Sequence, residues 1–302
     1  MENAGREGRL PTPGEIAGLE DVLTRTLQAL SAESTSRDVG PAMDSDTRAL
    51  LYDLQRAIER DELSLVYQPQ YDRDGAAILG VETLVRWIHP TRGPVSPALF
   101  IPLAETHGLI APVTTWVLDR LMTETSDLDI SVGFNASAIE FAEPGFVGRI
   151  DGLIRQHGYK HSRLEIEITE TAILSAEQQV RENMEQLRDL GLTVALDDFG
   201  AGYSSLRHLR RFPFDKLKID REFIADCTDD VQSATVVHAV VSIGRALGMK
   251  VVAEGVETEL QKKFLKVAGV HALQGYLFGK PLPIDALKLL VNAGPIQEAA
   301  TG

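Results

Sequence analysis

Six side chains of metal-binding type follow short apolar runs in this 302-residue sequence. Each stands at or just past the end of its run: Glu82, Asn135, Glu167, Asp197, Asp198 and Glu254. A polar group buried at a strand end is unfavourable unless it binds a partner. Carboxylate and amide oxygens without sulfur or clustered histidine favour hard cations such as Mg²⁺ or Mn²⁺. The adjacent pair Asp197-Asp198 suits two neighbouring cations, an arrangement that promotes phosphoryl displacement.

Any one of these acids, taken alone, has an ordinary structural explanation. It could cap a helix N-terminus, sit solvated in a loop or pair with a surface cation. Six such side chains at the ends of five strands are much harder to explain in that way. We therefore expect them to converge on one site.

The elements that must position them alternate between strand and helix along most of the chain. Such alternation predicts a mostly parallel sheet covered by helices. Eight strands are expected, at residues 63–70, 78–87, 131–134, 163–168, 193–196, 215–219, 251–253 and 272–275. Eight strands over roughly 240 residues suit a closed α/β barrel of the (β/α)8 type, whose active sites lie at the C-terminal strand ends.

Strand parity predicts which polar side chains point into such a barrel. Side chains alternate between the two faces of a strand, so the apolar positions should meet the outer helices. This rule directs Glu167, Asp197 and Lys218 inward. Glu165 and Lys216 should lie one layer deeper, where we favour a structural ion pair over catalysis.

Bulk composition narrows the class of partner. The formal charge is −14, from 30 basic and 44 acidic side chains, and no Lys/Arg run exists. This excludes extended nucleic acid as an expected partner, whereas bound divalent cations could still attract a small anion. No apolar stretch approaches the ~18 residues of a membrane helix. The single cysteine, Cys227, cannot form an intramolecular disulfide, so a reducing, cytoplasmic location is expected.

Residues 1–44 differ from the rest and predict a short helical N-terminal extension with a linker. Their apolar residues recur at helical spacing, at Ile16, Leu19, Leu23, Leu27 and Leu30. The segment could dock on a neighbour, pair with its copy, belong to an upstream sensor or partner domain, or fray. We expect the barrel domain at 45–292 and a C-terminal tail at 293–302.

Several short sequence motifs between about residues 44 and 291 resemble those of one protein family. They are Val81-Glu-Thr-Leu-Val-Arg-Trp87, Asp197-Asp-Phe-Gly-Ala-Gly-Tyr-Ser-Ser-Leu206, Leu217-Lys-Ile-Asp220, Ala253-Glu-Gly-Val-Glu257 and Gln274-Gly-Tyr276. In this order they are similar to the EAL-domain cyclic di-GMP phosphodiesterases. The resemblance implies a TIM-like barrel with one reversed strand, and a hydrolase that converts cyclic di-GMP to linear pGpG with Mg²⁺ or Mn²⁺.

The resemblance also implies roles for individual residues. One metal would be held by Glu82, Asn135, Glu167 and Asp197, while Asp197 bridges to a second ion bound by Asp198. Glu254 would help to hold the metals and their waters. The catalytic group would comprise Lys218 beside the attacking water, Glu170 steadying the loop after Asp198, and Glu257 as a supporting acid. Substrate contacts would come from Gln68, Arg86 and Gln274.

Departures from the family pattern are few, and none removes a metal-type group. Thr83 stands where the family has alanine, Gly133-Phe134 precedes Asn135, and Ala201 replaces a frequent threonine. The resemblance of Phe199 to Leu206 further implies a homodimer. Two other functions stay open, namely a catalytically weak cyclic di-GMP receptor and a protein-interaction module.

Overall fold

The computed structural model describes residues 45–170, 176–199 and 206–294. The expected N-terminal helix, most of the tail and residues 200–205 lie outside these ranges. Eight strands form a closed barrel in the order β1-β9-β8-β7-β6-β5-β4-β2, with β1 pairing back to β2. Their bounds are β1 Leu63–Asp72, β2 Ile78–His89, β4 Ser131–Asn135, β5 Leu164–Thr169, β6 Thr193–Phe199, β7 Lys216–Ile219, β8 Lys250–Ala253 and β9 Ala272–Leu273. The predicted barrel is confirmed.

Strand β1 is the reversed strand of this barrel. It runs antiparallel to both β2 and β9, whereas the pairs from β2 through β4 to β9 are parallel. An additional strand, β3 (Gly93–Val95), pairs with the end of β2 outside the barrel. The sequence did not predict β3, because three residues are too few to show an alternating pattern.

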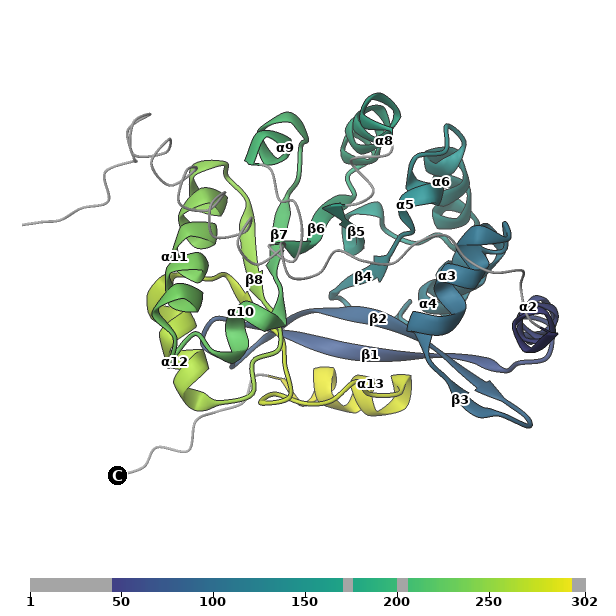
Figure 1. Cartoon of the computed structure of the whole chain (residues 1–302), viewed down its shortest axis with the longest axis horizontal. Coiled ribbons are helices and arrows are strands. Elements are labelled where there is room, and N and C mark those ends of the chain that lie inside the picture. The colour runs from purple at the N-terminus through teal and green to yellow at the C-terminus, as the bar shows by residue number, and fades with distance from the viewer. Residues whose placement is uncertain (1–44, 171–175, 200–205, 295–302) are drawn as a thin grey trace, which may run out of the picture.

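Helices cover the outside of the strands, as Figure 1 shows. The main ones are α2 Ser45–Ala57, α3 Pro97–Thr106, α4 Ile110–Glu124, α6 Phe146–His157, α8 Glu177–Asp189, α11 Val231–Ala246, α12 Glu259–Ala268 and α13 Ile284–Asn292. Shorter helical turns are α5 Ala138–Phe141, η1 His161–Arg163, α9 Leu206–Arg211 and α10 Arg221–Ala225. Among the described residues, no helix is both long and apolar enough to span a membrane.

The strands divide an apolar outer face from a polar interior. In β5 the side chains of Leu164, Ile166 and Ile168 are fully buried in the core, and burying each aliphatic side chain contributes about 1.5–3 kcal/mol. The alternate residues Glu165 and Glu167 are also buried, and each forms an ion pair with a lysine of β7. The predicted pair between Lys216 and Glu165 is confirmed.

Helix α12 begins with a capping box. The Thr258 hydroxyl accepts from the Gln261 backbone N–H, and the Gln261 side chain accepts in return from the Thr258 backbone. This reciprocal arrangement satisfies two N–H groups that have no partner within the helix. The helix ends at Gly269, whose φ of 94° is accessible to glycine without strain.

Candidate active site

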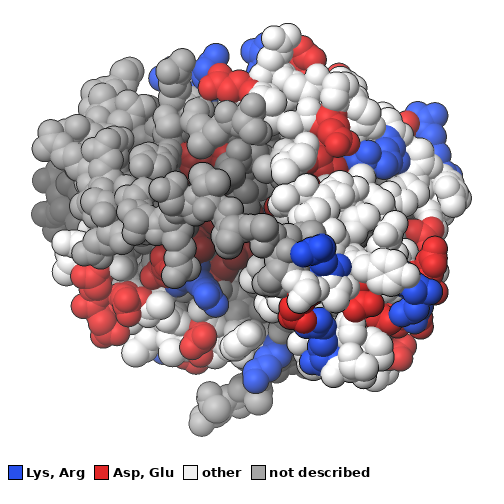
Figure 2. Space-filling view, turned by 45° about the vertical axis from the view of Figure 1, so that its right-hand side comes forward, with Lys and Arg blue, Asp and Glu red and all other residues white. Residues whose placement is uncertain are grey.

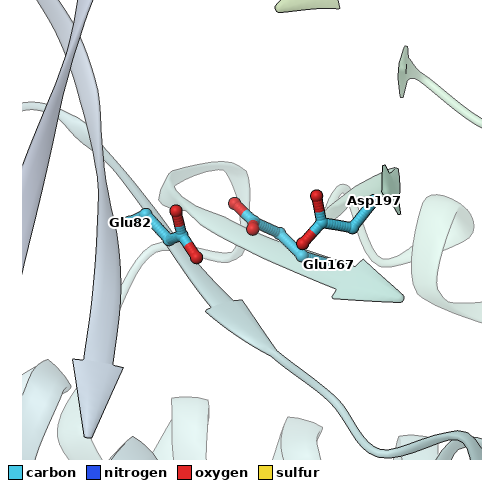
Figure 3. Close-up of side chains that lie close together, drawn as sticks. All are labelled: Glu82, Glu167 and Asp197. Atoms are coloured by element: carbon cyan, nitrogen blue, oxygen red, sulfur yellow. The ribbon is translucent and has the colours of Figure 1, made fainter. Parts of the chain in front are cut away.

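Three carboxylates from three strands meet at the C-terminal end of the barrel. Glu82 comes from β2, Glu167 from β5 and Asp197 from β6, and their carboxyl groups point toward one another in Figure 3. One oxygen from each lies within 4.8 Å of the others, and all three residues are buried. The register of the parallel strands brings these residues to the same end of the barrel. Asn135 of β4 pairs with Glu167 of β5, and Thr169 of β5 pairs with Asp197 of β6.

The ammonium group of Lys218 lies at the centre of this cluster. Its Nζ is 3.1 Å from Asp197 Oδ1, 2.7 Å from Glu254 Oε1 and 3.7 Å from Glu82 Oε2. It also contacts the carboxylate of Glu167, and only 1% of the Lys218 side chain is exposed. One cation therefore faces four carboxylates in a space that water hardly enters.

This imbalance of charge shifts the pKa values of Lys218, Glu167 and Glu254. Burial alone would lower the pKa of Lys218, but the carboxylates outweigh it and raise that pKa well above its usual value. Burial raises the pKa of Glu167, with Lys218 opposing and the other acids reinforcing. Burial likewise raises the pKa of Glu254 to about 8. The raised pKa values of Glu167 and Glu254 indicate that one lysine does not balance the buried acids, so the site favours additional positive charge.

A local irregularity in β6 turns two consecutive carboxylates toward this site. The register between β6 and β7 shifts between Leu196 and Phe199, and Asp198 has a φ of 52°. In a regular strand, adjacent side chains would point to opposite faces, and a bulge removes that constraint. Oxygens of Asp197, Asp198 and Glu254 consequently lie within 4.8 Å of one another. Asp197 belongs to both acidic groups.

Asp198 has a second acidic neighbour that the sequence did not single out. Partial desolvation, the adjacent Asp197 and a hydrogen bond with the Asp220 side chain raise the pKa of Asp198 to about 7. Asp220 lies directly after β7 and caps α10 by accepting from the Glu222 backbone N–H at 2.7 Å. Its position at a strand end is the signal that could have identified it.

The donor set fits divalent metal ions. Glu167 Oε1 is buried without a hydrogen-bond partner, and such an atom is costly unless something binds it. Asn135 Nδ2 donates to Glu82 Oε1 at 2.9 Å, an orientation that leaves the Asn135 carbonyl oxygen available as a ligand. Oxygen donors of this kind suit Mg²⁺ or Mn²⁺.

Two of the expected substrate residues are joined to the cluster. Gln274 Nε2 donates to Glu82 Oε2 at 2.5 Å and to Gln68 Oε1 at 3.4 Å. Gln70, which sequence reasoning missed, donates to Gln274 Oε1 at 3.0 Å. The antiparallel register between β1 and β2 sets Gln68 opposite Glu82. The reversed strand thus adds an amide-rich wall to the acidic site.

Arg86, the third expected substrate residue, lines a cavity of about 570 Å³. The cavity shares Asn135 with the metal-type residues and continues between β2, β4, α3 and α4. Its walls are largely apolar, with Ile101, Val113 and Phe134 among them. A space of this kind next to clustered polar groups is typical of small-molecule sites.

The remaining two predicted site residues lie on the segments that follow β5 and β8. Glu170 directly follows β5, and the loop that it is expected to steady includes residues 200–205, outside the described part. Glu257 is exposed on the loop before α12, and its backbone N–H binds Gln261. Their supporting roles stay predictions.

Charged side chains of both signs are spread over the described part of one face of the molecule (Figure 2). On the face in Figure 2, lysine and arginine side chains are interspersed with aspartate and glutamate. The described residues on that face form no continuous basic surface of the kind that binds extended nucleic acid.

Known proteins are similar to this chain in sequence and in fold. The family model described as "EAL domain" matches residues 52–281. The bifunctional diguanylate cyclase/cyclic di-GMP phosphodiesterase MucR of Pseudomonas aeruginosa is 42% identical over 79% of the chain and 36% of its own length. The cyclic di-GMP phosphodiesterase NbdA of the same organism is 38% identical over 80% of the chain and 32% of its length.

Solved structures agree with these relatives. The MucR phosphodiesterase in complex with c-di-GMP superposes with a TM-score of 0.74 at 42% identity, covering 79% of this chain and 99% of that one. An EAL domain protein from Listeria monocytogenes gives 0.69 at 32% identity, covering 83% and 100%. The chain belongs to the EAL domain family. It spans about a third of the length of these two curated relatives.

Proposed function

We propose that this chain hydrolyses cyclic di-GMP to linear pGpG by in-line attack of an activated water on phosphorus, with the ribose 3′-oxygen as the leaving group. The observation that carries the proposal is the double acidic group around Lys218, in which Asp197 is common to both halves. Relatives named as cyclic di-GMP phosphodiesterases support the choice of substrate.

Two divalent ions, held by Glu82, Asn135, Glu167, Asp197, Asp198 and Glu254, would lower the pKa of a water and neutralise the phosphate when bound. Among the residues that the structure describes, Lys218 is the cation that contacts four of the acids. From there its ammonium group donates hydrogen bonds that orient the nucleophile.

Substrate positioning falls to the neighbouring walls of the site. Arg86 offers a planar guanidinium that can bind a phosphate through two hydrogen bonds. Gln68 and Gln274 hold the substrate from the side of the reversed strand. Glu170 and Glu257 support the loops around the site. Positioning and electrostatics of this kind supply most of the catalysis in phosphoryl displacement.

A non-catalytic receptor for cyclic di-GMP is the alternative. The presence of every expected metal-type side chain favours turnover, because a receptor has no need for a lysine buried among acids. Incubation with cyclic di-GMP and Mn²⁺, followed by chromatography, separates the two. A protein that binds the nucleotide without forming pGpG would be a receptor.

Hydrolysis should require Mg²⁺ or Mn²⁺ and should be poorly supported by Ca²⁺. Ca²⁺ prefers six to eight ligands at roughly 2.3–2.6 Å, which would stretch a site built for smaller octahedral ions. The measurement is the initial rate of pGpG formation with each metal after removal of bound ions by a chelator. Equal rates with Ca²⁺ and Mn²⁺ would contradict the proposed metal class.

We expect the chain to form a homodimer, partly through the segment after Asp198 and helix α9. Residues 200–205 of that segment lie outside the described residues, so the family pattern of Phe199 to Leu206 carries this prediction. Light scattering at micromolar concentration measures the mass directly. A fully active monomer would count against it.

We propose a cytoplasmic location for the reaction, because a single cysteine leaves the chain without an intramolecular disulfide. Cys227 is buried, and burial raises the pKa of its thiol to about 11, so the thiol is poorly reactive. The greater length of the curated relatives supports an upstream sensor or partner domain as the source of regulation.

A further inference from the structure

The side chain of Gln261 joins two loops that border the acidic site. It lies in the first turn of α12 and is buried. Its Oε1 accepts from the backbone N–H groups of Glu257 and Thr258 at 2.8 and 2.9 Å. Its Nε2 donates to the backbone carbonyls of Ile224 and Ala225, both at 3.1 Å. One amide therefore makes four backbone hydrogen bonds.

These contacts use the full hydrogen-bonding capacity of the amide. A glutamine side chain offers two lone pairs on oxygen and two N–H donors, and here each of the four has a partner. The partners also fix the orientation of the amide, because the N–H groups lie on one side and the carbonyls on the other. A glutamate side chain could satisfy only the two N–H groups, because it has no donor for the carbonyls. An apolar residue of similar size could satisfy neither side.

Each of the joined loops carries a member of the acidic site. Ile224 and Ala225 end α10, which begins directly after Asp220, the hydrogen-bond partner of Asp198. Glu257 and Thr258 follow Glu254, whose carboxylate contacts Lys218. The loops after β7 and β8 are therefore held together behind the carboxylates that they present.

A second close contact lies between the same two loops. Gly255, next to Glu254, has a φ of 68°, and a Cβ atom on it would collide with Cβ of Arg221. Arg221 follows Asp220 in the chain. The backbones thus approach too closely for a side chain at residue 255, and Gln261 fixes the distance at the other end of α10.

We propose that Gln261 is a positioning residue that holds Asp198 and Asp220 at a set distance from Glu254, and so shapes the part of the site that takes the second cation. This inference rests on the proposed two-metal function. The hydrogen bonds of the Gln261 side chain all go to backbone groups, so Gln261 would act on the site through the two loops. Residues that orient metal ligands in this indirect way typically change metal affinity by about 10–100-fold when replaced.

The alternative role for Gln261 is only to cap α12, and Gln261→Glu separates the two. Glutamate at the third position of a helix still completes a capping box and suits the positive end of the helix. The same change removes both donors and sets a charge against the carbonyls of Ile224 and Ala225. The variant therefore preserves the cap and breaks the connection between the loops.

Thr258→Ala is the matched control. It removes the hydroxyl that caps α12 but keeps the Thr258 backbone N–H that Gln261 binds. The experiment measures binding of Mn²⁺ alone by calorimetry, together with thermal unfolding of the metal-free protein. We expect Gln261→Glu to lower the Mn²⁺ affinity of the lower-affinity site by about 10–100-fold. Thr258→Ala should lower the melting temperature and leave Mn²⁺ affinity unchanged.

The inference is overturned if Gln261→Glu binds Mn²⁺ like the wild type, or if both variants lose Mn²⁺ affinity to the same extent. Should Gln261→Glu fail to fold, Gln261→Ala decides by the same comparison, since it breaks the connection without adding charge. A wild-type protein that binds two Mn²⁺ ions but forms no pGpG would refute the proposed function and leave this comparison valid.

Discussion

Replacing Lys218 with alanine is expected to slow hydrolysis of cyclic di-GMP by a factor on the order of 10²–10⁴, the usual effect of losing an acid–base group. Lys218 is buried and contacts four carboxylates, so no other described cation can take its place beside the nucleophile. The measurement is single-turnover formation of pGpG with saturating Mn²⁺. Calorimetric binding of cyclic di-GMP with Ca²⁺ should survive the change.

The same substitution should also destabilise the metal-free protein. Removing one partner of a buried ion pair typically costs about 3–5 kcal/mol, although the raised pKa of Glu254 allows that acid to take up a proton instead. Saturating Mn²⁺ should restore most of the lost thermal stability, because it replaces the missing positive charge and binds only the folded state. Thermal unfolding with and without Mn²⁺ tests this compensation.

Lys216→Ala is the matched control for this experiment. Lys216 lies on the same strand and face, one layer deeper, and pairs with Glu165. Its loss should reduce stability and leave the turnover of the folded protein nearly unchanged. A folded Lys218→Ala variant with normal turnover would disprove the catalytic role. Equal losses of turnover in both variants would indicate that Lys218 is structural.

Asp197→Asn is expected to abolish both metal binding and turnover. Asp197 is the only residue common to both acidic groups among the described residues, and a neutral amide cannot bridge two cations as a carboxylate does. Bound metals contribute several kcal/mol to such reactions, and each 1.4 kcal/mol is about tenfold. The rate should therefore fall by a factor on the order of 10³ or more. Calorimetry with Mn²⁺ measures the binding.

The folded state of Asp197→Asn should survive without metal. Removing one negative charge relieves the crowding of acids around Lys218, so the metal-free variant should unfold at or above the wild-type temperature. Asp189→Asn makes the same change of charge at an exposed position at the end of α8 and should behave like the wild type. If Mn²⁺ still raises the melting temperature of Asp197→Asn as it does for the wild type, Asp197 is not a shared ligand.

The sequence by itself determined the barrel and much of its polar interior. Alternation in β5 separated Leu164, Ile166 and Ile168 from Glu165 and Glu167, because side chains in a strand have a period of two. The same rule predicts that the side chains of Glu167, Asp197 and Lys218 all point into the barrel. Local pattern was sufficient here because the outer face of a parallel strand must be apolar. The family resemblance implied one reversed strand, which is confirmed, and the structure identifies it as β1.

Only the tertiary structure decided the details that depend on neighbouring strands and loops. The register shift at Asp197 and the positive φ of Asp198 turn two adjacent carboxylates to one site, against the alternation that the sequence predicts. The contact of Asp220 with Asp198 likewise depends on how β6 and β7 are staggered. Gln261 appears in the sequence as an ordinary capping residue. Its contacts with Ile224 and Ala225 arise because residues more than 30 positions apart meet in the barrel.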